Sequence, residues 1–499
     1  MKFARVVLIA LAATFFLFGI CGHAPAVPEK PRGPARGMVA VVLACTTQTT
    51  DPKGADVAYQ FDWGDGTRSG WSAFVAGGQA FADTHTYSQP GSYEVKARAK
   101  NSKKASGWSE PLTLLVDPAE GGVRWSFAFT DPEDPEDSAD FSLNTFGLDL
   151  DRDAAYIGCD YGGFIARKLD RTLRWEFVNP DGDEFMGGAS VGPDGTVFTS
   201  CANDSFYALN PNGTRKWVIY VGEDVYATPA VASNGTVYIH TMGDSLLAVS
   251  NGTRLWSCFT GGGCSSPAIG KDGTVYVANQ EGSIFALDPT TGTKKWSYSL
   301  STSEIMASPA IDDSLGTTYV CDENGWFASL SLSDLSENWV VQVGEAPSSP
   351  VVGPDHTIYV GAGGKLYALD PTNGLALWTY VPPLSDGVVS TPAVSSSGCI
   401  YFLVTVGKRA RSASRQGSDN RFENPDSLYA VNSNGSRRWA CALGEGFSAE
   451  FISSPKLDAD GNIYIGSGLA AWCVRGTGGP AASPWPMFQA DAANTGRAR

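Results

Sequence analysis

The chain has 499 residues, of which 43% are hydrophobic and only 18% are charged, and it contains 57 glycines. Its net charge of −16 argues against nucleic acids and anionic membranes as partners, because both repel an acidic surface. The length and the glycine content favour several domains or one large repeat fold, with many turns rather than long charged helices.

The N-terminus carries an export signal. Residues 1–21 place two basic residues before an apolar run that is short for a membrane span, which is typical of a signal peptide. The small residues at 24–26 fit cleavage there. Alternatively, Cys21 before the Pro-rich linker 22–34 is the lipid-attachment residue of a lipoprotein, although Ile20 is not the usual small residue before it. Both routes predict an extracytoplasmic protein of the periplasm, outer membrane or cell surface, touching a membrane only through that lipid.

Ten cysteines in a chain of this length do not form a disulfide framework, since none are adjacent and none are spaced as CxxC. Cys258 and Cys264 flank a glycine-rich segment and could pair in an oxidising compartment. The pattern favours the alternative that most of the cysteines are small buried apolar side chains.

Residues 35–118 predict an Ig-like β-sandwich. The segment 91–101, GSYEVKARAKN, alternates apolar and charged residues, as a half-buried strand does. The segment 61–66, FDWGDG, runs from a strand into an Asp-Gly turn. About seven short strands separated by such turns are expected in this unit.

Two motifs in this unit, FDWGDG and THTYSQPGSYEVKARAKN, resemble the polycystic-kidney-disease (PKD) domain family. The resemblance implies an extracellular adhesion or spacer module. Asp62, Asp65 and His85 belong to these motifs, so we interpret them as turn and fold residues rather than catalytic ones.

From residue 123 onward the sequence repeats. Tryptophans recur in one slot at intervals mostly near 40 residues, which is the period of four-stranded β-propeller blades. They are Trp125, Trp175, Trp217, Trp256, Trp296, Trp339, Trp378 and Trp439. Within one period, Asp272-Gly273 predicts the turn between the first two strands (A and B), and Thr291-Gly292 the turn between the last two (C and D).

Residues 123–486 contain eight A-B-C units but only seven following D strands. The strand around Trp125 is therefore expected to complete the eighth blade and close the ring, leaving no sheet edge unpaired. The fold class is all-β, a PKD-like sandwich followed by an eight-bladed propeller. Residues 487–499 are expected to be a tail packed across a rim.

The repeat GTVYVANQEGSIFALDPTTGTKKW and the segment PWPMFQADAANTGR are similar to those of quinoprotein-type (PQQ-like) propellers. That family includes quinone-dependent dehydrogenases and also cofactor-free members, such as the propeller lipoprotein of the barrel-assembly machinery. Quinoprotein alcohol dehydrogenases carry an adjacent cysteine pair, which this chain lacks. We therefore predict no cofactor, no metal and no catalytic residue, and expect Trp326 and Trp472 to pack between blades.

The four histidines are scattered, and two indicate structural roles. His356 occupies the usual glycine slot of an A–B turn, and His240 ends a B strand. Two Asp-rich segments that resemble calcium loops lack the glutamate of such loops and coincide with A–B turns. Neither feature indicates a catalytic site.

Two departures from the repeat are candidate binding segments. A basic B–C insertion at about 406–426 carries Lys408, Arg409, Arg411, Arg415 and Arg421, and an acidic D–A link spans 130–140. Both loop classes emerge on one rim, so we expect the two segments on one face, either as solvated loops or as a docking surface.

The predicted function is non-catalytic binding or scaffolding of proteins or glycans in the cell envelope or at the surface. The alternatives are a PQQ-dependent dehydrogenase and a polysaccharide-active enzyme with a PKD accessory module. The oligomeric state cannot be read from these patterns.

Overall fold

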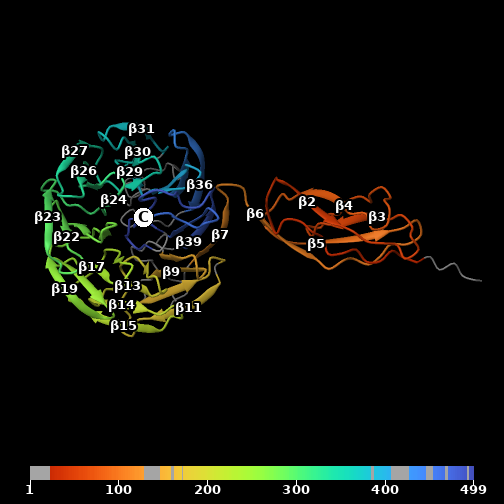
Figure 1. Cartoon of the computed structure of the whole chain (residues 1–499), viewed down its shortest axis with the longest axis horizontal. Helices are drawn as coiled ribbons and strands as arrows, with labels where there is room; N and C mark the ends of the chain where they lie inside the picture. Colours follow the sequence, from red (N-terminus) through yellow and green to blue (C-terminus); the bar gives the residue numbers. More distant parts are fainter. Residues whose placement is uncertain are drawn as a thin grey trace, which may run out of the picture. The chain divides into compact units, whose positions relative to one another are not determined.

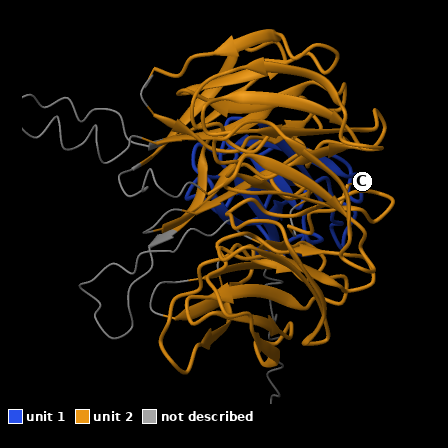
Figure 2. Cartoon of the chain, turned by 90° about the vertical axis from the view of Figure 1, so that its left-hand side faces the viewer, with its two compact units in different colours: residues 1–119 blue, residues 120–499 orange. Residues whose placement is uncertain are grey.

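The protein is described by a computed structural model that divides into two compact units, residues 1–119 and 120–499 (Figure 1). Figure 2 colours the two units separately. The structure describes residues 23–128, 147–158, 162–170, 172–383, 387–405, 426–444, 453–466, 470–491 and 494–498. Within these ranges, the regular elements are all β-strands.

The first unit is the predicted sandwich, with six strands in its described part rather than about seven. One sheet has the order β1 (Arg36–Met38), β6 (Leu112–Asp117), β5 (Gly91–Lys100) and β3 (Ala58–Asp62); the other pairs β2 (Val42–Thr47) with β4 (Phe81–Thr86). The alternation predicted along β5 is confirmed, because Val95, Ala97 and Ala99 are buried between charged neighbours.

The FDWGDG motif of the sandwich stabilises its own loop through hydrogen bonds of Asp65. The Asp65 carboxylate accepts hydrogen bonds from the Thr67 backbone N–H and hydroxyl, and it lies 2.7 Å from His85 Nε2. The His85 ring stacks on Trp63, with ring centroids 5.0 Å apart. These contacts account for the motif as structure, as the sequence predicted.

The second unit is a ring of eight sheets in its described part (Figure 1). The strands of each blade are given from the ring centre outward. Blade one consists of β8 (Gly147–Asp149), β9 (Ala154–Gly158), β10 (Gly163–Arg167) and β11 (Leu173–Val178), and blade two consists of β12 (Ser190–Val191), β13 (Val197–Cys201), β14 (Ser205–Leu209) and β15 (Arg215–Tyr220). Blade three consists of β16 (Ala230–Val231), β17 (Val237–His240), β18 (Ser245–Ser250) and β19 (Thr253–Phe259), and blade four consists of β20 (Ala268–Ile269), β21 (Val275–Ala278), β22 (Ser283–Leu287) and β23 (Lys294–Ser299).

Blade five consists of β24 (Ala310–Asp312), β25 (Thr317–Cys321), β26 (Trp326–Ser331) and β27 (Glu337–Gln342), and blade six consists of β28 (Val351–Val352), β29 (Ile358–Ala362), β30 (Lys365–Leu369) and β31 (Ala376–Tyr380). In blade seven, β32 (Val388–Val389) and β33 (Ala393–Val394) both pair with β34 (Ile400–Thr405), which is followed by β35 (Asp426–Val431) and β36 (Arg437–Gly444). Blade eight consists of β37 (Lys456–Leu457), β38 (Asn462–Gly466), β39 (Ala470–Arg475) and β7 (Val123–Ala128). The predicted closure is confirmed, because β7 pairs antiparallel with β39.

The repeated tryptophan and glycine form one contact between neighbouring blades. Trp256 donates its indole N–H to the Pro289 carbonyl of the next blade at 3.0 Å. A Cβ added to Gly292 in that turn would lie 2.5 Å from the Trp256 ring. Equivalent pairs are Trp175–Gly213, Trp217–Gly252, Trp339–Gly374, Trp378–Gly435 and Trp439–Gly121. Glycine is therefore required at this turn position for two reasons: its φ is positive, and the tryptophan ring leaves no room for a Cβ atom.

The last of these pairs shows how the ring is sealed. Gly121 precedes β7 and takes the place of a turn glycine, donating its N–H to the Arg475 carbonyl at 2.7 Å. The segment before β7 and the end of β39, far apart in sequence, thus together take the place of a C–D turn.

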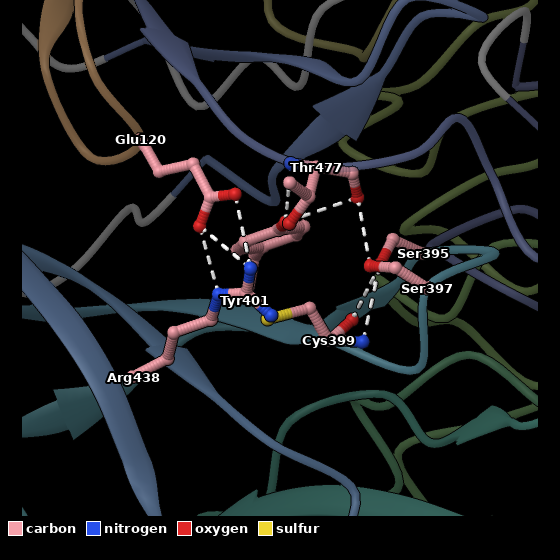
Figure 3. Close-up of polar contacts among 7 residues, drawn as sticks. All are labelled: Glu120, Ser395, Ser397, Cys399, Tyr401, Arg438 and Thr477. Carbon is pink, nitrogen blue, oxygen red and sulfur yellow. Dashed lines mark hydrogen bonds and ion pairs between the residues drawn. The ribbon is translucent and has the colours of Figure 1, made fainter. Parts of the chain in front are cut away.

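A polar network ties this seam to blade seven (Figure 3). Arg438 donates to both Glu120 carboxylate oxygens, at 2.8 and 2.9 Å. Tyr401 accepts the Thr477 backbone N–H at 2.8 Å, and the Ser397 hydroxyl donates to the Thr477 carbonyl at 3.0 Å. Bidentate Arg–carboxylate pairs are geometrically specific, so the network fixes the closing segments in register.

The inner strands are joined around the axis by hydroxyl groups. The Thr228 N–H donates to the Ser266 hydroxyl, the Ser266 N–H to the Ser308 hydroxyl, and the Ser308 N–H to the Ser349 hydroxyl, each at 2.9 Å. This explains why a serine or threonine recurs before the proline that precedes each of these strands.

The C-terminal segment lies at the ring centre, which corrects the prediction of a tail across a rim (Figure 1). Val352 donates to the Trp485 carbonyl and Val394 to the Pro486 carbonyl, both at 2.7 Å, while Ile269 donates to Gly496 at 2.6 Å. The inner strands would otherwise leave these backbone N–H groups without partners, and a buried unpaired N–H is costly. The tail therefore completes the inner edges of several blades.

Candidate binding face

The propeller has two chemically different faces. Strands alternate in direction, so the D–A links and B–C loops emerge on one face, here called the loop face, and the A–B and C–D turns on the other, the turn face. From blade two to blade six, the loop face consists of residues 179–189, 202–204, 221–229, 241–244, 260–267, 279–282, 300–309, 322–325, 343–350 and 363–364.

The charged side chains of the loop face between blades two and six are all acidic. Its carboxylates are Asp181, Asp183, Glu184, Asp204, Glu223, Asp224, Asp244, Glu281, Glu304, Asp322, Glu323 and Glu345. These segments, all of which the structure describes, contain no lysine or arginine. Such separation of charge creates a negative potential in front of this face.

Three of these carboxylates lie close to one another at blade five. The pKa of Glu323 is raised by burial and by the charges of Glu304 and Asp322. Asp322 is itself buried, and its carboxylate accepts the Ser301 hydroxyl at 2.5 Å and the Trp326 N–H at 2.8 Å. Like charges held this close favour an incoming cation over an incoming anion.

Large apolar side chains are exposed at the same edge of the strands. Tyr220 and Phe259 end their D strands and are 68% and 64% exposed; Met306, in the link between blades four and five, is also exposed. Trp326 is 42% exposed, so the prediction that it packs between blades is wrong, whereas Trp472 is buried as predicted. Exposed aromatics near carboxylates are typical of protein interfaces and can hold cations over their rings.

The segments that the sequence singled out lie outside the described residues. They are Cys21, the acidic link, and the insertion with Lys408, Arg409, Arg411, Arg415 and Arg421. The flanking strands are described: β34 and β35 enclose the insertion, and β7 and β8 enclose the acidic link. The approach of the two segments to each other stays a prediction.

The structural roles predicted for two histidines are consistent with their surroundings. His356 has a φ of 65° in its A–B turn, and its Nδ1 lies 2.6 Å from the buried Asp312 carboxylate of the neighbouring blade. His240 is fully buried, with both ring nitrogens 3.0 Å from backbone carbonyls, those of Gly261 and Ser265.

Burial lowers the pKa of His240 against the opposing effect of these two carbonyls. The unfolded chain therefore binds the proton more readily, and we expect the free energy of unfolding to fall as the pH drops below about 6.5. Urea unfolding at pH 7.5 and pH 5 should show a smaller fall for His240→Gln than for the native chain. An identical fall in both would contradict this role.

The described cysteines are unpaired, so Cys258 and Cys264 do not form the disulfide considered above. Cys264 Sγ instead lies 3.5 Å from Met242 Sδ. Burial raises the pKa of the Cys45 and Cys201 thiols to about 11, which makes them inert apolar side chains.

Over the described ranges, no cluster of three potential metal ligands occurs, and no helix has the length and apolarity of a membrane span.

The two units define a class of protein: a PKD-type sandwich followed by an eight-bladed PQQ-like propeller. A family model described as outer membrane protein assembly factor BamB matches residues 112–380, more than half of the chain, and the PKD domain model matches residues 29–110. The chain therefore belongs to the BamB-type propeller family, whose fold suggests a binding or scaffolding role.

Individual relatives are distant. The serine/threonine-protein kinase AfsK of Streptomyces griseus is 25% identical in an alignment of 338 positions that covers 58% of this chain and 38% of the kinase. The chain thus spans less than half of that relative. BamB from Moraxella catarrhalis is 14% identical, with a TM-score of 0.55 over 71% of this chain and 99% of that structure. Sqt1 from Saccharomyces cerevisiae is 11% identical, with a TM-score of 0.55 over 68% of this chain and 96% of that structure. Both structures share the propeller fold.

Proposed function

We propose that this protein is an exported, non-catalytic scaffold that binds proteins of the cell envelope or surface through its loop face. The observation that carries the proposal is the run of carboxylates over five blades with no lysine or arginine among them. Folding alone does not require this segregation, because the same positions could carry mixed charge. A face of one sign accelerates encounter with a partner of the opposite sign.

The chemistry of the face indicates the kind of partner. Glu304, Asp322 and Glu323 are not neutralised by any described lysine or arginine, so a basic segment would relieve their mutual repulsion. Trp326 and Met306 stand exposed on the same blade-five edge and supply apolar contact area. A partner segment with lysines or arginines beside apolar residues fits both features.

The extracytoplasmic location is part of the proposal. It is supported by the signal-peptide pattern of residues 1–21, by the PKD domain, and by a family model whose description refers to outer membrane protein assembly. Cys21 is the proposed lipid attachment. The basic insertion with Lys408 and Arg409 is a second contact segment in the same proposal.

The proposal is tested by capture of partners from an envelope extract with the tagged mature chain. The variant Glu304→Gln/Asp322→Asn/Glu323→Gln should reduce capture by about tenfold, because each removed charge pair contributes modestly and the effects combine. Raising the salt concentration should weaken capture by the native chain and affect the variant less.

The matched control is Asp194→Asn/Asp355→Asn on the turn face, where Asn234 fills the same slot in blade three. Equal capture by the native chain and the loop-face variant would contradict the proposal. Deletion of residues 408–421 tests the insertion separately, and recovery of glycans instead of proteins would overturn the partner class.

A further inference from the structure

The turn face carries a groove of the opposite charge. It lies between blades three and four and has a volume of about 460 Å³. Two cations line it, Lys271 and Arg497, together with the polar side chains of Asn234, Thr236 and Thr290. None of its lining residues is an aspartate or a glutamate, in a protein whose net charge is −16.

The backbone around Arg497 is held in place by the inner strand of blade four. Ile269 donates its N–H to the Gly496 carbonyl at 2.6 Å, and Ala498 donates its N–H to the Ile269 carbonyl at 2.8 Å. Arg497 Nε is buried and has no hydrogen-bond partner. The position of this cation is thus set by the fold.

Nearby carboxylates are already engaged. Asp313 accepts the Lys271 backbone N–H at 3.1 Å, and burial raises the pKa of Asp313. Arg497 also lines a neighbouring cavity of about 260 Å³ that includes Asp149, Asp151 and Asp491, and Asp149 is paired with Arg152 at 2.9 Å. The Asp491 carboxylate accepts the Thr495 N–H at 2.9 Å and the Thr495 hydroxyl at 2.5 Å. Lys271 is exposed and can receive an outside anion, and Arg497 adds a second positive charge to the lining of the same groove.

The walls of the groove favour a peptide over a sugar. The one aromatic ring among its lining residues is that of Tyr238, which is only 2% exposed, so no ring face is open for a sugar to stack on. Leu255 is exposed and, with Pro289, offers an apolar wall for an aliphatic side chain. The amide and hydroxyl groups can pair with a peptide backbone.

We propose that this groove binds an extended acidic peptide segment, whose carboxylates pair with Lys271 and Arg497. Recognition of acidic motifs by clustered cations is an established mode of peptide binding. The site lies on the face opposite to the loop face, so it does not depend on the function proposed there, and one molecule could hold a basic and an acidic partner together.

The test is fluorescence polarisation with a labelled peptide of alternating glutamate and serine, using the full mature chain. Binding should weaken at least about tenfold in Lys271→Glu/Arg497→Glu, because two attractions become repulsions. The variant Arg215→Glu changes charge on the outer strand of blade two and should bind like the native chain. The corresponding glutamine–serine peptide should bind much more weakly than the acidic one.

Three results would overturn the proposal: equal binding by the native chain and the double variant, equal binding of the acidic and the glutamine peptides, or binding of an oligogalacturonate but not of the acidic peptide. Circular dichroism and thermal unfolding of each variant check folding. If the double variant unfolds, Lys271→Gln alone gives the same comparison, because Lys271 is exposed.

Discussion

Replacing Gly292 by alanine should destabilise the propeller by about 2–4 kcal/mol, because two costs combine. The residue has a φ of 71°, which costs an alanine roughly 1 kcal/mol. The added Cβ would also lie 2.5 Å from the Trp256 ring of the preceding blade. That ring is buried and its indole N–H is bonded to Pro289, so it cannot move away without losing the contact. Urea unfolding followed by tryptophan fluorescence measures the change.

Gly235→Ala separates the two costs. Gly235 has a φ of 82°, but no atom lies within 4 Å of the position of an added Cβ. Its substitution should therefore cost only the backbone part, roughly 1 kcal/mol. Equal destabilisation at Gly292 and Gly235 would show that the tryptophan contact contributes nothing to the requirement for glycine.

The repeat explains why most of the fold was predictable. Turn residues such as Asp272 and Gly273 fix local hairpins, and the tryptophan spacing fixes the blade length, so strand order followed without any long-range information. Ring closure by the strand around Trp125 followed from counting, because one D strand was missing at one end and present at the other. Each of these inferences used interactions that recur in every blade.

The tail was misplaced because it has no counterpart in the repeat. The tail contacts backbone N–H groups of the inner strands. Every residue type except proline has such a group, so these contacts cannot be recognised from the pattern of side chains. One signal was available: blade eight has Lys456 where most other blades have alanine. The structure shows that Lys456 is fully buried and donates to the Phe488 and Asp491 carbonyls of the tail.

The loop face was missed for a different reason. Its carboxylates occur one to three at a time in separate loops, in groups shorter than the acidic link or the basic insertion. Sorting charged residues by their slot in the repeat would have found the segregation. The same sorting would have indicated the exposure of Trp326, because the equivalent slot at the start of the C strand holds a half-buried serine in blades two, three and four and a lysine in blade six.

Replacing Trp485 by alanine should destabilise the propeller by about 3–5 kcal/mol, the usual cost of removing a large side chain from a packed core. Trp485 is 2% exposed and belongs to the same core cluster as Val352 and Val394, which lie on the inner strands of blades six and seven. Its backbone also completes the edge of the blade-six strand. Loss of the side chain leaves a cavity where several blades meet, so the effect should extend over the ring rather than stay in the tail.

Trp296→Ala is the matched control, because the same side chain is 45% exposed on the outer strand of blade four and lies on no turn glycine. Its removal should cost less than about 1 kcal/mol. Thermal unfolding and limited proteolysis of both variants distinguish the two roles: a tail that only rests on the surface would give similar small effects at both positions. A tail that completes the inner edges predicts early cleavage within the propeller for Trp485→Ala alone, because the inner strands then lose their partner and open first.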